Sequence, residues 1–157
     1  MDIFLERAEI NHLQEIEELC VGSIAQCCKA DYTPAQIEAW INRLRSSGRL
    51  AEAVKSQFFQ IAHNQDKLLG IGSLDANGYL DFLYVAPYAQ RRGVASLILQ
   101  HLESEAFRRH ETEIRSHVSK TALPFFRKNG FQTISDKVNQ LGQERLVNFE
   151  MKKILKD

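Results

Sequence analysis

The spacing of apolar side chains changes along the chain, from a helical period to a strand-like one near residue 57. Before this point apolar residues recur every three or four positions, which predicts a short strand at 2–7 and then helices over 11–24 and from 34 to about 45. Beyond it, short apolar blocks alternate with polar turns, as is typical of strands. The expected strands are 57–63, 68–74, 79–85, 113–118, 131–138 and 145–154. Two further helices are expected, one from just after residue 93 to about residue 107 and one over 120–128.

Local signals mark several of these boundaries. Thr33 and Gln36 form a capping box with Pro34 at the first helical position, and Asn11 is predicted to cap the first helix. Residues 46–48 are expected to stop the second helix, and residues 75–78 form a hairpin signal. No repeat, low-complexity run or linker interrupts the pattern, so a single α/β domain over residues 1–157 is expected.

Composition narrows the classes of function. The formal net charge is zero, which argues against a broad nucleic-acid surface, and no apolar run is long enough to span a bilayer. The first ten residues lack a basic-then-apolar signal pattern, so a cytoplasmic location is expected. The cysteines at 20, 27 and 28 lack a zinc-ligand spacing and are predicted to be free thiols, two buried and one half-exposed; no metal is expected.

The segment from Tyr79 to about residue 107 carries the most specific signal. Pro87 ends a buried strand, and Gly93 is small where the chain enters a helix. The first amides of a helix lack intrahelical partners and carry partial positive charge, which Arg91 and Arg92 would reinforce. These residues predict an anion site, although a plain turn with two solvated arginines fits them as well. Neither a G-x-G-x-x-G run nor a P-loop sequence is present.

Two motifs in order resemble those of the GNAT superfamily of acetyl-CoA-dependent N-acetyltransferases. The first is Gln-Arg-Arg-Gly-Val-Ala at 90–95 after Val-x-Pro, and the second runs from Ser119 to Gly130-Phe131. The segment 32–40 (Tyr-Thr-Pro-x-Gln-Ile-x-x-Trp) is similar to small bacterial members. The resemblance implies a mixed, mostly antiparallel sheet flanked by helices, acetyl-CoA as co-substrate, and transfer of an acetyl group to a primary amine of a small molecule or peptide.

The resemblance also implies which residues hold the cofactor. The pyrophosphate would lie on the amides of the turn and the helix start, and the backbone of Leu83 and Val85 would pair with the pantetheine arm. Ser119 stands where an Asn is usual, which weakens that contact. The residues implied for cofactor binding are Leu83, Val85, Gln90, Arg91, Arg92, Gly93, Val94, Ala95, Ser96, Ser119 and Phe126.

The reaction needs a neutral amine, and Asp81 is the candidate base. It is the one charged residue within an apolar strand, and regular alternation places it on the same face as Leu83 and Val85. A buried carboxylate needs a reason to be there, and catalysis is one. A structural pair with an arginine is the alternative.

The thiolate can leave in one of two ways: without protonation, or with a proton donated by a side chain. Phe126 stands where many family members have Tyr, and it cannot donate a proton. An alkyl thiol has a pKa near 8.5, so the thiolate can leave with little help; otherwise Tyr84, Tyr32 or His117 reaches the sulfur. Tyr84 is the second candidate catalytic residue. His117 fits the role of a satisfied strand residue better than that of a catalyst.

Acceptor binding is predicted on Asp31, Tyr32 and Trp40, whose charge and aromatic faces suit a cationic amine. Equally, Trp40 fits the core and Tyr32 the surface. A catalytically impaired CoA-binding regulatory module remains an alternative because of Phe126; a phosphate-binding domain unrelated to acyl transfer is disfavoured by the paired motifs. No nucleic-acid or membrane partner is expected, and exposed C-terminal strands leave a homodimer open.

Overall fold

The computed structural model describes residues 2–156, so Met1 and Asp157 at the two ends of the predicted domain lie outside the described residues. The helices are the 3-10 turns η1 (Ile10–His12) and η2 (Pro87–Ala89) and the α-helices α1 (Leu13–Cys27), α2 (Pro34–Ser46), α3 (Arg49–Ser56), α4 (Val94–Arg108) and α5 (Leu123–Lys128). The strands are β1 (Phe4–Arg7), β2 (Phe58–His63), β3 (Leu68–Leu74), β4 (Tyr79–Val85), β5 (Glu113–Ser119), β6 (Gln132–Leu141) and β7 (Glu144–Ile154).

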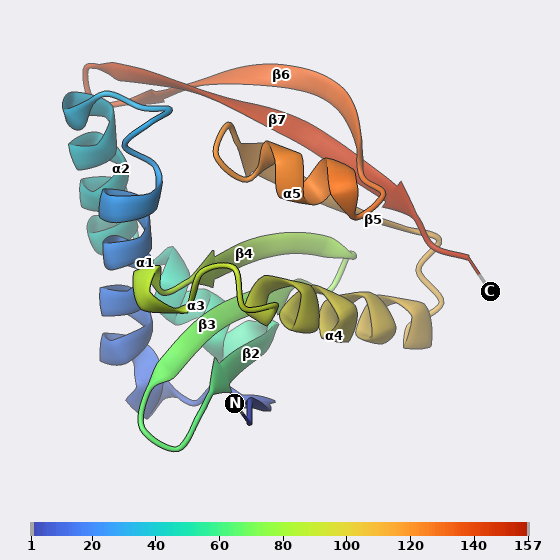
Figure 1. Ribbon diagram of the computed structural model, residues 1–157. Helices are drawn as coiled ribbons and strands as arrows, with labels where there is room; N and C mark the ends of the chain where they lie inside the picture. Colours follow the sequence, from blue (N-terminus) through green and yellow to red (C-terminus); the bar gives the residue numbers. More distant parts are fainter. Residues whose placement is uncertain (1, 157) are drawn as a thin grey trace.

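All seven strands join one mixed sheet in the order β1-β2-β3-β4-β5-β7-β6, and β4 with β5 is the parallel pair. The mostly antiparallel sheet flanked by helices is the architecture that the sequence predicted. Figure 1 shows α4 in front of the central strands, α3 behind them, and the β6–β7 hairpin above α5.

The parallel strands β4 and β5 separate soon after they start. They pair only at Tyr79 with Arg115 and Leu80 with Ser116, and the rest of β4 has no strand on that side. In Figure 1 the two halves of the sheet are accordingly well apart beyond this point. No pattern in the sequence indicates this split, because such patterns predict strands and not their pairing.

Most boundaries follow the local signals, with two exceptions. The Thr33 side chain accepts from the Gln36 amide while the Gln36 side chain accepts from the Thr33 amide, which is the predicted capping box. The Asn11 cap was wrong: a 3-10 turn with Glu9 as its N-cap, two residues earlier, comes first, and α1 follows it with His12 as N-cap. Helix α3 was missed because Gly48 stops α2 and then starts a new helix in a left-handed conformation (φ 74°).

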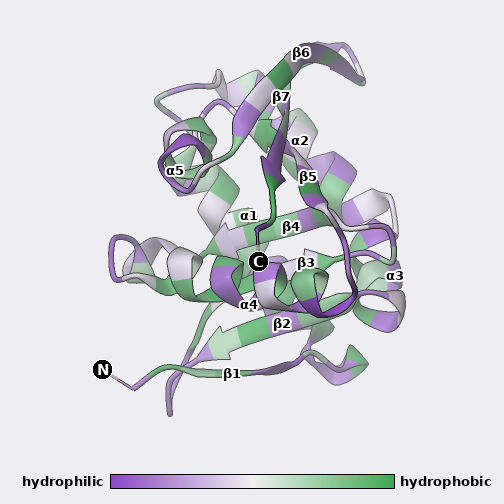
Figure 2. Cartoon of the chain, turned by 90° about the vertical axis from the view of Figure 1, so that its right-hand side faces the viewer, coloured by the Kyte–Doolittle hydropathy of each residue, from purple (hydrophilic) through white to green (hydrophobic). Residues whose placement is uncertain are grey.

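Two glycines in β3 let α4 lie directly on the sheet. A Cβ on Gly70 would come within 2.9 Å of Val94 and 3.0 Å of Ile98 of α4, and one on Gly72 would clash with Ile98. The buried residues of β3, β4 and α4 therefore form one continuous core. Figure 2 shows β2 and β4 as hydrophobic over most of their length. Close packing here fixes where α4 starts relative to β4.

A β-bulge in β4 changes which face Asp81 occupies. Ser73 pairs with Phe82 and Leu74 with Leu80, so Asp81 is the extra residue. Leu83 lies opposite Gly72, and a Cβ on Gly72 would meet both the Leu83 side chain and Ile98 of α4, so Leu83 is on the α4 face. Asp81 instead bonds Arg49 at the start of α3. The prediction that Asp81 shares a face with Leu83 and Val85 was therefore wrong, because the bulge breaks the strict alternation on which it relied.

Candidate active site

On the α4 side, the turn after β4 leaves a helix start open. Gly93 is the N-cap of α4 with a left-handed φ of 80°, and no side chain caps the helix. Arg91 is also left-handed (φ 61°), so two nearby residues turn the chain sharply before the helix. A Cβ built on Gly93 would meet nothing within 4 Å. The first amides of α4 thus point into accessible space, as an anion site requires.

The backbone of β4 beside this helix start has hydrogen-bonding groups without a strand partner. The Ala86 amide donates to the Leu69 carbonyl (2.9 Å) across the β3–β4 ladder. By antiparallel alternation, the backbone groups of Leu83 and Val85 point the other way, toward the side that β5 has left. An extended ligand could pair with this edge.

Gln90 is tied to the turn itself. Its side-chain amide donates to the Val85 carbonyl (2.9 Å), so it supports the turn and takes one of the acceptors on the open edge. Arg91 and Arg92 are both exposed at the helix start. Val94 is buried, whereas Ala95 and Ser96 are partly exposed where the open amides lie.

On the other face of the sheet lies a cavity of about 490 Å³, which we call the acceptor cavity. Its lining comes from α2, the α2–α3 turn and the strands β4, β5, β6 and β7, so it lies over the split between β4 and β5. It contains Asp81, Tyr84, Tyr32, Trp40 and Ser119 among the residues that the sequence singled out. The open edge of β4 therefore borders two separate spaces, one on each face of the sheet.

Asp81 is held at the floor of the acceptor cavity by two donors. Arg49 bonds one carboxylate oxygen and the Gln57 side-chain amide donates to the other (2.8 Å). The Asp81 side chain is 9% exposed, and that of Arg49 is 61% exposed. Arg49 also lies over the Phe82 ring at 5.3 Å. Asp81 thus has the arginine partner considered at the sequence level and still faces the cavity.

Tyr79 and His117 form a second polar pair where β4 and β5 separate. The Tyr79 hydroxyl lies 2.7 Å from His117 Nδ1. Burial, followed by the nearby Asp81 charge, raises the pKa of Tyr79 to about 12, and burial followed by the Lys137 charge lowers the pKa of His117. His117 Nε2 is buried and has no hydrogen-bond partner among the described residues, so His117 is only half satisfied.

Tyr84 faces the acceptor cavity from the strand position opposite Ile71. Its ring lies 6.5 Å from that of Trp40, which in turn packs edge-on against Tyr32 at 5.5 Å. Burial raises the pKa of Tyr84 well above its ordinary value, so its hydroxyl stays protonated at neutral pH. It is thus a neutral proton donor close to the split.

The predicted acceptor residues are not all brought together. Tyr32 is buried, and its hydroxyl donates to the Val147 carbonyl (2.9 Å) and accepts from the Lys120 amide (3.0 Å). It therefore joins β7 to the loop before α5 and is no surface ring. Asp31 is exposed, accepts from the Thr121 hydroxyl (2.8 Å) and lies outside the acceptor cavity.

Two residues of the second motif are mainly structural. Phe126 is 3% exposed and packs edge-on against Phe125 and Phe131, with the Phe131 amide donating to its carbonyl at a helix end closed by Gly130 (φ 92°). The Ser119 hydroxyl accepts from the Ala122 amide (3.1 Å). Phe126 does not line the acceptor cavity, and Ser119 does.

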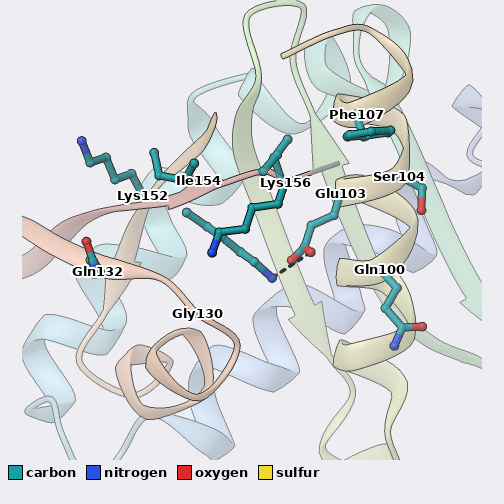
Figure 3. A pocket seen from close by; sticks show the side chains of 11 residues that line it. Gln100, Glu103, Ser104, Phe107, Gly130, Gln132, Lys152, Ile154 and Lys156 are labelled. Carbon is teal, nitrogen blue, oxygen red and sulfur yellow. Dashed lines mark hydrogen bonds and ion pairs between the residues drawn. The ribbon is translucent and has the colours of Figure 1, made fainter. Parts of the chain in front are cut away.

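A larger cavity of about 980 Å³ lies between α4 and the end of β7 (Figure 3). Glu103 and Lys153 pair there at 2.9 Å, and Lys152 points away from them in Figure 3. It contains none of the candidate site residues. Within residues 2–156 no cluster of three or more His, Cys, Asp or Glu could hold a metal ion, and no helix is long and apolar enough to cross a membrane.

Sequence reasoning missed several residues of the site. Arg49, in the overlooked α3, lines the cavity, and Gln57, directly after α3, bonds Asp81 from outside the lining. Tyr79 opens β4, and Arg43 and Lys137 are ordinary surface charges by pattern. Only α3 left a usable signal, in Leu50, Ala53 and Val54 at helical spacing. The three cysteines are free, with Cys20 and Cys28 buried and Cys27 half-exposed, as predicted.

Comparison with known proteins decides the family. The model of the acetyltransferase (GNAT) domain matches residues 28–155. The chain belongs to the GNAT family. An uncharacterized N-acetyltransferase of Escherichia coli (strain K12), YafP, is 32% identical over 143 residues, 88% of this chain and 89% of that protein. This GNAT protein is accordingly an N-acetyltransferase, a transferase by class.

Solved GNAT structures agree with the fold. A GCN5-related N-acetyltransferase from Rhodopseudomonas palustris superposes with a TM-score of 0.93 at 27% identity, covering 99% of this chain and 97% of that one. PaiA N-acetyltransferase from Thermoplasma acidophilum, solved in complex with coenzyme A, gives 0.79 at 23% identity, covering 98% and 99%. At that identity the second comparison speaks for the fold alone.

Proposed function

We propose that this protein binds acetyl-CoA along the open edge of β4 and transfers its acetyl group to a primary amine in the acceptor cavity. The observation that carries the proposal is the open backbone edge of Leu83 and Val85 next to the uncapped start of α4 at Gly93. A pyrophosphate fits a helix start with free amides and an arginine at its entrance. A pantetheine arm, which carries amide groups, fits an unpaired strand edge. The coenzyme A bound to the Thermoplasma acidophilum protein, which has the same fold, is consistent with this.

In this reaction the amine nitrogen attacks the thioester carbonyl, a C–N bond forms, the C–S bond breaks, and the amine loses a proton. Asp81 is the proposed proton acceptor, because it is the carboxylate of the acceptor cavity and is held in place by Arg49 and Gln57. It would act directly or through a water molecule. General bases of this kind contribute about 10²–10⁴ to the rate.

The thiolate needs little help in leaving, because an alkyl thiol has a pKa near 8.5. Where a proton is needed, Tyr84 is the proposed donor, since its hydroxyl is neutral and it faces the cavity next to the split in the sheet. Phe126 takes no part, because it has no exchangeable proton and is packed between two other rings.

The binding half of the proposal is tested with two matched glycine substitutions. Gly48 and Gly93 are both left-handed N-caps (φ 74° and 80°), and a Cβ on either meets nothing within 4 Å. Alanine at either position therefore brings a similar left-handed backbone strain, about 1–2 kcal/mol. Calorimetry should show that Gly93→Ala weakens acetyl-CoA binding about tenfold or more and that Gly48→Ala leaves it unchanged. Equal affinities for the two variants would rule out the cradle.

The transfer half is tested by release of free thiol from acetyl-CoA with a broad panel of amines. Acceleration by any amine, with the N-acetylated product found by mass spectrometry, supports transfer. If acetyl-CoA binds and no amine accelerates its turnover, the chain is a CoA-binding module whose catalysis is impaired.

A further inference from the structure

The charges that line the acceptor cavity do not balance. Four acidic or basic side chains other than histidine line it: Arg43, Arg49, Asp81 and Lys137. Arg49 and Asp81 neutralise each other as an ion pair. The cavity is left with two positive charges, on Arg43 and Lys137, and with no acidic side chain to compensate them.

These two cations are available to a ligand. Among residues 2–156, no hydrogen bond or ion pair engages the side chain of Arg43 or Lys137. Arg43 comes from α2 and Lys137 from β6, two elements that contact each other. Both side chains are exposed, so they lie at the rim of the cavity that they line. They approach the cavity from different elements, unlike neighbours on one solvated helix face.

The Lys137 charge also reaches the interior of the cavity. After burial, it is the largest cause of the lowered pKa of His117, so His117 stays neutral and adds no charge at pH 7. Asp31, the acid predicted to attract a cationic amine, lies outside and is engaged by Thr121. An acceptor with a second positive charge would therefore meet only like charges at the rim.

We infer that the acceptor is an amine that also bears an anionic group, a carboxylate or a phosphate, held by Arg43 and Lys137. The inference rests on the proposed transfer reaction and specifies its substrate class. Arg43 and Lys137 lie at α2 and β6, whereas Asp81 and Tyr84 lie on β4. The anion would therefore be bound at the rim while the amine points to β4. Trp40 and Tyr84 provide aromatic walls for the carbon stem between them.

The test uses acceptor pairs that differ in the anion alone: amino acids against their amides, and aminoalkyl phosphates against the matching amino alcohols. Initial rates of thiol release give kcat/KM for each. The expected result is a kcat/KM at least tenfold higher for the anionic member in one of the two kinds of pair. Which kind shows it identifies the anion as a carboxylate or a phosphate. Neutral members or diamines as the best substrates would overturn the inference while leaving acetyl transfer itself intact.

Charge-neutral variants locate the anion. Arg43→Gln and Lys137→Gln should each raise KM for the anionic acceptor about tenfold and change the neutral member less than twofold. Arg45→Gln, two residues further along α2 and outside this cavity, and Lys152→Gln, in the other cavity, are the matched controls. Lys137→Glu should shift the preference toward neutral or cationic amines.

The same loss of kcat/KM on both members of a pair would contradict anion binding by these residues. Thermal unfolding of each variant shows that the change is not one of stability, and all four positions are exposed or partly exposed. If no amine of the panel is acetylated although acetyl-CoA binds, the proposed function fails and this inference fails with it.

Discussion

Replacing Asp81 by Asn separates a base from a structural ion pair, because the two roles respond differently to pH. An alkylamine with a pKa near 10 is about one part in a thousand neutral at pH 7 and about one part in ten at pH 9. If Asp81 serves to remove the amine proton, Asp81→Asn should lower kcat/KM about a hundredfold or more at pH 7. Between pH 7 and pH 9 the neutral fraction of the free amine rises about a hundredfold without any help from the protein. The loss of kcat/KM in the variant should therefore shrink by up to about a hundredfold.

The contacts of Asp81 determine how much stability the protein loses when the Asp81–Arg49 ion pair is removed. Asp81 bonds Gln57 and Arg49, and the Arg49 side chain is 61% exposed. Loss of the charge in such a partly solvated pair costs about 1 kcal/mol, or roughly 2–4 °C in Tm for a chain of this length. Arg49→Gln removes the same pair and leaves the carboxylate, so it should show the same loss of Tm with a much smaller loss of turnover.

The assay is thiol release from acetyl-CoA between pH 6.5 and 9 with the best amine of the panel, together with calorimetry for acetyl-CoA. Because Asp81 faces away from Leu83 and Val85, the affinity for acetyl-CoA should stay within about threefold. The reasoning is refuted if the ratio of wild-type to variant rates is constant across this pH range. It is also refuted if Arg49→Gln reproduces the full loss.

Three further outcomes can be measured on stability. Tyr32→Phe removes both hydrogen bonds of a buried hydroxyl and should lower the free energy of unfolding by about 1–3 kcal/mol, measured by urea denaturation. Gly72→Ala should cost about as much, because its Cβ collides with Ile98; an unchanged midpoint would contradict the close packing of α4. The folded pKa of His117 is lowered, so the unfolded chain binds more protons and stability should fall as the pH drops below about 6.5; His117→Gln should flatten this part of a Tm-against-pH curve.

Local signals in the sequence predicted local structure well. The capping box of α2, the hairpin between β3 and β4 and the end of α5 at Gly130 are each set by neighbours within a few residues. The turn before α4 belongs to the same class, since a left-handed Gly93 and an uncapped helix are properties of a short segment, whereas anion binding there stays a prediction.

The acceptor cavity could not be predicted in this way, because its lining comes from strands and helices far apart in the chain. The residues next to Lys137 in the sequence do not show that its charge lowers the pKa of His117. Likewise, the residues next to Asp31 do not show that Asp31 bonds Thr121 outside the cavity. Which face of the sheet Asp81 occupies depends on the bulge in the pairing of β4 with β3. A prediction that assumes strict alternation of side chains along a strand cannot include such a bulge. Residues that act through distant contacts were therefore the ones misplaced.

The bulge at Asp81 means that β4 is one residue longer than its ladder with β3 requires. Deleting that residue would leave a regular strand, with Leu80 and Phe82 on their present partners, and the chain should still fold. The shortened protein would retain its helix start at Gly93 and its open edge, the two features on which the proposed acetyl-CoA site rests. What it would lack is the carboxylate on the opposite face, so under the proposed function a single codon separates a carrier of the acyl donor from a catalyst.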